Sequence, residues 1–178
     1  ALCHDMAKPA TTQLIDGSWK ARGHEKAGKR PTLDFLDSIG APNWVKEKVV
    51  PLVVNHLAYA SGKPTPRMVR RLANRLGNKV SIQDLSLLVL ADHSGRSPLP
   101  QVMPSRMQQI LDIAASEKVD KGQPQALLMG KDLIDLGLRP GPQFGVLLKQ
   151  AFQAQLDGVF FDKEGAIDWV RGRLNLQP

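Results

Sequence analysis

Hydrophobic side chains recur along most of the chain every three or four residues, the spacing of one face of an α-helix. One such pattern predicts a helix over 29–38, with Gly40 as its C-cap. A second pattern, over 45–60, contains Pro51 and predicts a bent helix that begins near Asn43. We find no alternating strand pattern of useful length and no internal repeat, so the predicted fold class is all-α.

Capping signals mark where the central helices begin. Thr65-Pro66 is typical of an N-cap followed by proline at the first helical position, and the glycine at 77 ends that helix. Ser81 and Asp84 form a capping box, with Asp in place of Glu, before a helix that is apolar almost throughout and therefore expected to be buried. Further helices are predicted over 103–116, 131–136, 144–156 and 162–174.

The first thirty residues are less regular. Residues 1–8 are interpreted as the last turns of a helix, because Pro9 disfavours helical geometry at Lys8. Residues 10–29 are polar and contain three glycines, which predicts a loop. The chain does not begin with methionine, so we expect it to be part of a longer protein. Ser97-Pro98-Leu99-Pro100 marks a boundary between two predicted helical domains, 1–100 and 101–178.

Composition indicates an ordinary soluble protein, with 42% apolar and 23% charged residues. The single cysteine, Cys3, excludes an internal disulfide framework and is most simply a small core residue. The most apolar run, 45–60, contains three charged residues and a proline, so no membrane span is expected. No secretory signal is visible, and the expected location is the cytoplasm.

The net charge of +7 comes entirely from the first predicted domain. Residues 1–100 carry 15 basic and 8 acidic side chains, whereas residues 101–178 carry 9 of each. This asymmetry suggests that the first half meets a polyanion, although a solvated basic surface is the plain alternative. Four arginines fall on one predicted helix face and are candidates for phosphate contacts, with a solvated helix face given equal weight: Arg67, Arg70, Arg71 and Arg75.

Histidine and aspartate residues at segment ends are the candidate chemistry. The series is His4, Asp5, His24, His56 and Asp92, and we expect these residues to converge on one site. Imidazole and carboxylate are suitable ligands for a divalent metal, and mixed sets of this kind accept Mg, Mn, Ni, Co, Fe or Zn. For His56 alone, which lies on an apolar face, a hydrogen-bonded core histidine is the usual interpretation. A carboxylate at the end of a buried helix, as at Asp92, is costly unless it is paired or binds metal.

Two sets of residues resemble bacterial CCA-adding tRNA nucleotidyltransferases and poly(A) polymerase-family proteins that carry an HD domain. Residues 1–9, with His24, 52–56 and 91–96, resemble an HD phosphohydrolase domain. Residues 130–142, with 155–158 and 166–170, resemble the C-terminal helical domain of the same enzymes and are the more specific of the two sets. Together they cover nearly the whole chain.

The resemblance implies roles for individual residues. His4, Asp5 and Asp92 match the metal ligands of HD enzymes, and His24 and His56 match positions that hold a second metal or contact phosphate. Catalysis would then involve His4, Asp5 and Lys8, with Lys8 neutralising phosphate charge or being a plain surface lysine. A further ligand histidine of this family would lie upstream of residue 1. The nucleotide-transferring head is absent from these residues, so we expect no nucleotide addition by them alone.

The resemblance implies an enzyme of tRNA 3′-end maturation, with an HD domain that hydrolyses phosphomonoesters or 2′,3′-cyclic phosphodiesters. Its partners would be tRNA or another RNA and a nucleotide substrate. One alternative is a non-catalytic scaffold whose arginine face holds tRNA for a catalytic head elsewhere. Another is a stand-alone HD phosphohydrolase acting on free nucleotides. The oligomeric state is left open.

Overall fold

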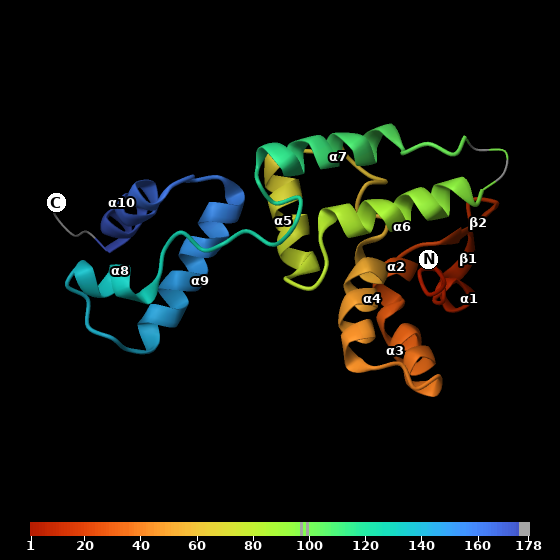
Figure 1. The fold of residues 1–178 in the computed structure, drawn as a ribbon, viewed down its shortest axis with the longest axis horizontal. Helices are drawn as coiled ribbons and strands as arrows, with labels where there is room; N and C mark the ends of the chain where they lie inside the picture. The colour runs from red at the N-terminus through yellow and green to blue at the C-terminus, as the bar shows by residue number, and fades with distance from the viewer. Residues whose placement is uncertain (97, 99, 175–178) are drawn as a thin grey trace. The chain divides into compact units, whose positions relative to one another are not determined.

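The computed structural model describes residues 1–96, 98 and 100–174, and its secondary structure is mostly helical, which confirms the all-α class (Figure 1). Ser97 and Leu99 of the predicted boundary, and residues 175–178 of the second predicted domain, lie outside the described residues. Of the described helices, none is long and apolar enough to cross a membrane. The elements in chain order are α1 (Lys8–Thr11), β1 (Thr12–Ile15), β2 (Ser18–Ala21), α2 (His24–Ala27), α3 (Lys29–Ser38), α4 (Asn43–Asn55), α5 (Pro66–Leu76), α6 (Ile82–Ser94), α7 (Ser105–Ser116), α8 (Gly130–Asp135), α9 (Pro142–Asp157) and α10 (Lys163–Leu174).

The chain divides into two compact units, residues 1–123 and 124–178. The predicted division after residue 100 falls inside the first unit, because α7 packs against α5 and α6 of that unit. Met107, Ile110 and Ala114 of α7 are fully buried in the core of the first unit. A boundary signal rich in proline therefore marks a connection between two packed helices and not the end of a core.

The core of the first unit lies between α5, α6 and α7 (Figure 1). Both predicted helix starts are confirmed, because Met68 N donates to Thr65 Oγ1 at 3.2 Å and the Ser81–Asp84 capping box is complete. These caps satisfy backbone N–H groups that have no partner inside the helix. The buried apolar side chains of this core are Val69, Leu72, Ala73, Leu76, Val80, Ile82, Leu85, Val89, Met107, Ile110, Ala114 and Val119.

The N-terminal segment differs from the prediction. Residues 2–7 form turns, and Pro9 lies in the first turn of α1, where a missing N–H costs nothing, so it does not end a helix. The predicted loop over 10–29 contains the β1–β2 hairpin and the short helix α2. The hairpin turns at Asp16-Gly17, where both residues have positive φ (51° and 73°). Asp-Gly is a strong signal for such a turn, but the strands that flank it are only four residues long.

The second unit packs α8, α9 and α10 around its own core, which includes Leu133, Ala151 and Val170. Its most buried charged side chain is Asp132, which is 3% exposed. Asp132 accepts a hydrogen bond from the backbone N–H of Met129 at 2.8 Å and pairs with Lys163 Nζ at 2.7 Å. The Lys163 hydrogen bond, followed by that of Met129, holds the pKa of Asp132 below its ordinary value.

Asp132 should make the second unit sensitive to acid. A lowered pKa in the folded state means that its contribution is complete above its ordinary pKa, near 4, and is lost as pH falls through the folded value. We expect Asp132→Asn to lower stability by about 1 kcal/mol at pH 7 and to flatten the acid dependence below about pH 4. Hydrogen-exchange protection of the α8 and α10 amides, measured between pH 3 and 7, checks this. An equally steep loss of protection in the variant would contradict it.

Candidate metal centre

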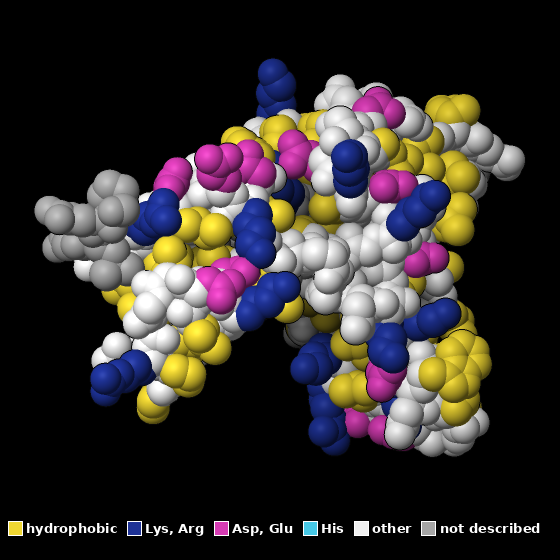
Figure 2. Space-filling model, turned by 60° about the vertical axis from the view of Figure 1, so that its left-hand side comes forward, with side chains coloured by type: hydrophobic (Ala, Val, Ile, Leu, Met, Phe, Trp, Pro, Cys, Tyr) yellow, Lys and Arg dark blue, Asp and Glu magenta, His cyan; other side chains and the backbone are white. Residues whose placement is uncertain are grey.

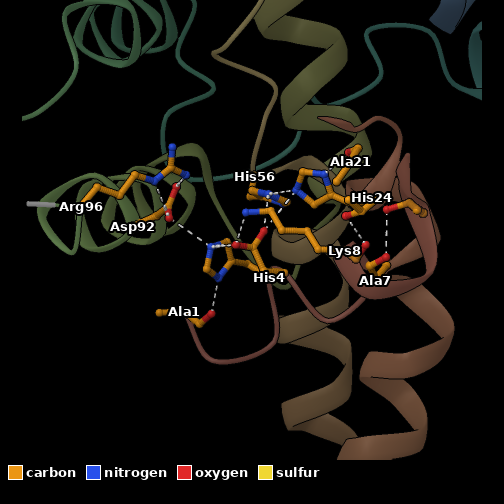
Figure 3. A network of polar contacts seen from close by, with 12 residues as sticks. Ala1, His4, Ala7, Lys8, Ala21, His24, His56, Asp92 and Arg96 are labelled. Carbon is orange, nitrogen blue, oxygen red and sulfur yellow. Dashed lines mark hydrogen bonds and ion pairs between the residues drawn. The ribbon is translucent and has the colours of Figure 1, made fainter. Parts of the chain in front are cut away.

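The five predicted ligand residues come together at one place in the first unit (Figure 3). His4 and Asp5 lie on the turns before α1, and His24 is the first residue of α2. His56 follows the last residue of α4, and Asp92 lies in the last turn of α6. His24, His56 and Asp92 are therefore at or beside helix ends, and His4 and Asp5 lie just before a helix, so that side chains from several segments can reach one point.

Backbone carbonyls set the tautomer of all three histidines. Nδ1 of His4 contacts the carbonyl of Ala1 at 2.5 Å, that of His24 contacts Ala21 at 2.6 Å, and that of His56 contacts Val53 at 2.7 Å. A carbonyl oxygen only accepts hydrogen bonds, so the proton of each neutral ring is on Nδ1. The three Nε2 atoms then have free lone pairs, as in histidines that bind metals.

The free lone pairs of His24 and His56 face each other. Their Nε2 atoms are 3.2 Å apart, and Asp5 Oδ1 lies 3.2 Å from the first and 3.9 Å from the second. Both histidines are buried, with exposures of 6% and 3%. Three electron-rich atoms at this separation repel one another in a site that water reaches poorly. The arrangement is stable when a cation lies between them.

The geometry of this group fits a divalent metal. The ligand atoms of Asp5, His24 and His56 all lie within 4.8 Å of one another. Metal–nitrogen bonds of about 2.0–2.1 Å place tetrahedral ligand atoms about 3.3 Å apart, close to the observed separation of the two imidazoles. The three residues can therefore hold a metal ion without rearrangement of the backbone.

His4 and Asp92 form a second group around the same aspartate. Nε2 of His4 lies 3.2 Å from Asp5 Oδ2 and 3.1 Å from Asp92 Oδ1. Asp5 thus presents one oxygen to the His24–His56 pair and the other to His4. A carboxylate shared in this way is the usual bridge where two cations bind side by side.

Two basic side chains neutralise the carboxylates. Lys8 Nζ lies 2.5 Å from Asp5 Oδ2, and the guanidinium of Arg96 pairs with Asp92, with Nε at 3.2 Å from Oδ1. Lys8 was predicted at the site, whereas Arg96 was missed as a site residue. Its position four residues after Asp92 was the available signal, because such residues share a helix face.

The local electrostatics favour ligands that are ready to bind. Burial opposes ionisation of Asp5, but the hydrogen bond from Lys8, the charge of Lys8 and the attraction to His4 and His24 in their protonated forms outweigh it, so the pKa of Asp5 lies below its ordinary value. Burial lowers the pKa of His56, and its hydrogen bond to Val53 only partly offsets this. At neutral pH the carboxylate is therefore charged and the imidazole of His56 is neutral, as a metal requires.

A glycine allows the two buried histidines to meet. Gly28 lies between α2 and α3, and a Cβ atom there would lie 2.9 Å from Val53 Cγ1 and 3.1 Å from the carbonyl of His24. The φ of Gly28 is −63°, so close packing and not backbone conformation requires the glycine. The absence of a side chain brings α2 against the end of α4, and with it His24 against His56.

Cys3 takes no part in the cluster. Its side chain is 6% exposed, and burial raises the pKa of its thiol, which stays protonated. A protonated thiol is a poor nucleophile and a poor metal ligand. Cys3 is the small core residue that was predicted.

The arginine face of α5 is not arranged as predicted. Arg70 is only 8% exposed, and its Nη1 pairs with Glu117 Oε2 at 2.6 Å, so it lies on the core side of the helix. We therefore withdraw Arg70 as an RNA contact. Arg67 lies on the exposed side and Arg71 at its edge, while Arg75 Nε donates to Asn55 Oδ1 at 3.0 Å. RNA binding by these three stays a prediction.

Comparison with known proteins adds a distant relative. No protein-family model matches the chain, and no solved structure matches it significantly. The chain is similar to the A-adding tRNA nucleotidyltransferase of Deinococcus radiodurans, with 27% identity over 163 residues. The match covers 88% of this chain and 37% of the relative, so the chain spans little more than a third of the relative's length. This distant similarity supports the predicted resemblance to tRNA nucleotidyltransferases over most of the chain.

Proposed function

We propose that the chain is the metal-dependent phosphohydrolase part of a tRNA nucleotidyltransferase-type protein, and that it acts on phosphoesters at RNA 3′ ends. The observation that supports this best is the convergence of the Nε2 atoms of His4, His24 and His56 on a shared carboxylate, Asp5. The lone pairs of these imidazoles and of the carboxylate point toward one place, and a bound cation would satisfy all of them. The similarity to an A-adding tRNA nucleotidyltransferase supports RNA as the substrate class.

His4, Asp5 and Asp92 would hold one divalent cation, and His24 and His56 would hold a second one through the shared Asp5. When bound, a divalent cation of the Mg, Mn, Ni, Co, Fe or Zn type supplies Lewis acidity toward a phosphoryl oxygen and makes water more acidic. The carbonyls of Ala21 and Val53 keep both imidazoles in the ligand tautomer.

Two cations of the chain itself complete the site. Lys8 and Arg96 would offset the negative charge of a bound phosphate after a metal takes over the carboxylates that they now contact. Both side chains are about half exposed, at 42% and 49%, so each is free to move toward a ligand at the mouth of the site.

Turnover of a 2′,3′-cyclic nucleotide with Mn²⁺ tests the proposal. We expect hydrolysis that requires the metal and that falls more than about a hundredfold in His4→Ala. His93→Ala is the matched control, because His93 is next to Asp92 in α6 but has no contact with the cluster among the described residues. Metal-independent turnover, or turnover unchanged in His4→Ala, would overturn the proposal.

The second candidate function is that of a tRNA-binding scaffold, with the cluster kept for stability. It is favoured by the basic character of the first unit, where Lys and Arg side chains lie over the lobe formed by α3 and α4, interspersed with Asp and Glu (Figure 2). The two candidates differ in the metal requirement. A scaffold binds RNA with or without metal and shows no turnover.

A further inference from the structure

A pocket of about 360 Å³ lies beside the candidate metal centre, between α2, the end of α4 and the end of α5. Its wall includes Asn55 and Leu57, the two neighbours of His56, and Glu25 and Lys26, which follow His24. The pocket wall therefore contains sequence neighbours of both buried histidines, while the histidines themselves do not line it.

One guanidinium in this pocket is held by an amide and not by a carboxylate. Asn55 is 7% exposed, its Nδ2 donates to the carbonyl of Pro51 at 2.8 Å, and its Oδ1 accepts from Arg75 Nε at 3.0 Å. Within the part of the chain that the structure describes, Arg75 has no ion pair with a carboxylate. Asn55 therefore fixes the orientation of Arg75 without adding a negative charge, and the guanidinium has no direct carboxylate contact among the described residues.

The charged residues near Arg75 make the pocket more positive than negative. Partial burial, and then the charge of Arg71 one turn away, lower the pKa of Arg75, which nevertheless stays protonated. Lys26 is exposed on the same wall, and Glu25 is the carboxylate opposite these cations. The terminal N–H groups of Arg75 have no partner among the residues that the structure describes. An arginine oriented in this way is suited to a phosphate, which it binds through two parallel hydrogen bonds.

We propose that this pocket binds a phosphate group of an RNA strand, a phosphate other than the one that reacts, with Arg75 and Lys26 as its ligands. The choice of RNA rests on the proposed function. Arg75 and Lys26 act as specificity residues here: they hold the strand, and the neighbouring cluster holds the reacting phosphate. A mononucleotide with a single phosphate has nothing to place in the pocket.

Binding of a fluorescent single-stranded oligoribonucleotide, measured by anisotropy without divalent metal, tests this inference. We expect Arg75→Gln to weaken binding about tenfold and to reduce the slope of log affinity against log salt by about 0.7, the loss of one phosphate contact. Arg139→Gln, which removes an exposed arginine that does not line the pocket, is the matched control and should change affinity less than about twofold. Equal weakening by both variants, or none by Arg75→Gln, overturns the inference.

Further variants and a competition experiment make the test independent of folding and of hydrolysis. Lys26→Gln removes an exposed side chain on the pocket wall, so it leaves the core intact, and we expect it to weaken binding about threefold. His93→Ala, outside both the cluster and the pocket, should bind the oligonucleotide as the wild type does. Inorganic phosphate should compete with the oligonucleotide in the wild type but not in Arg75→Gln, and equal competition in both overturns the pocket. Absence of hydrolysis in the wild type overturns the proposed function alone.

Discussion

Replacing His56 with alanine is expected to lower the affinity for Mn²⁺ by more than about a hundredfold. Its Nε2 is one of the three atoms that lie within 4.8 Å of one another, and the loss of an outer-shell partner alone already costs metal sites about 10–100-fold. Isothermal titration calorimetry of the protein with Mn²⁺ measures the affinity directly. The metal should also raise the unfolding temperature of the wild type and leave that of the variant unchanged.

The metal prediction has two internal controls. His24→Gln removes the partner imidazole and should have an effect similar to that of His56→Ala, because each ring supplies one ligand atom. His93→Ala should bind Mn²⁺ as the wild type does. If His56→Ala retained wild-type affinity while still folded, the facing imidazoles would be a hydrogen-bonded pair that shares a proton, and no metal centre would exist there.

Replacing Arg70 with alanine should destabilise the first unit by about 2–3 kcal/mol. Arg70 and Glu117 have side-chain exposures of 10% and 22%, and removal of one partner leaves the other with a poorly solvated charge. The expected loss is smaller than the usual range of about 3–5 kcal/mol because water still reaches Glu117. Urea unfolding followed by circular dichroism gives the free energy, and Arg67→Ala on the same helix should change it by less than about 0.5 kcal/mol.

The double variant Arg70→Met, Glu117→Leu separates packing from charge. Apolar side chains of similar volume should restore most of the lost stability, because neither leaves a charge behind. RNA affinity should be unchanged in Arg70→Ala, since the guanidinium does not reach the surface. If Arg70→Ala lost RNA affinity without losing stability, Arg70 would be an RNA contact after all.

Local sequence signals predicted helix bounds and caps well where these features do not depend on tertiary packing. The bounds of α3 were predicted correctly, and the Thr65 cap and the Ser81–Asp84 capping box lie where expected. These signals work because a cap is decided by a few neighbouring residues. The β1–β2 hairpin was missed because its strands are too short to show an alternating pattern, although the Asp16-Gly17 turn was visible.

The site was predicted in its members but not in its arrangement. Histidine and aspartate at the ends of apolar segments indicated a metal centre, and the structure brings all five residues together. No local pattern could show that the carbonyls of Ala21 and Val53 select the tautomer, since these contacts depend on the hairpin and on the end of α4. Likewise, helical spacing placed Arg70 with three other arginines, and only the packing of α7 shows that it faces Glu117.

The chain by itself determined an all-α fold, most helix starts, and a set of ligand types suited to a divalent cation. Tertiary structure decided which side chains share one point, which arginine is buried, and that α7 belongs to the first core. The reason is physical: periodicity and caps are properties of residues a few positions apart. Ligand geometry, desolvation and close approach, as at Gly28, depend instead on segments tens of residues apart that meet only when the core packs.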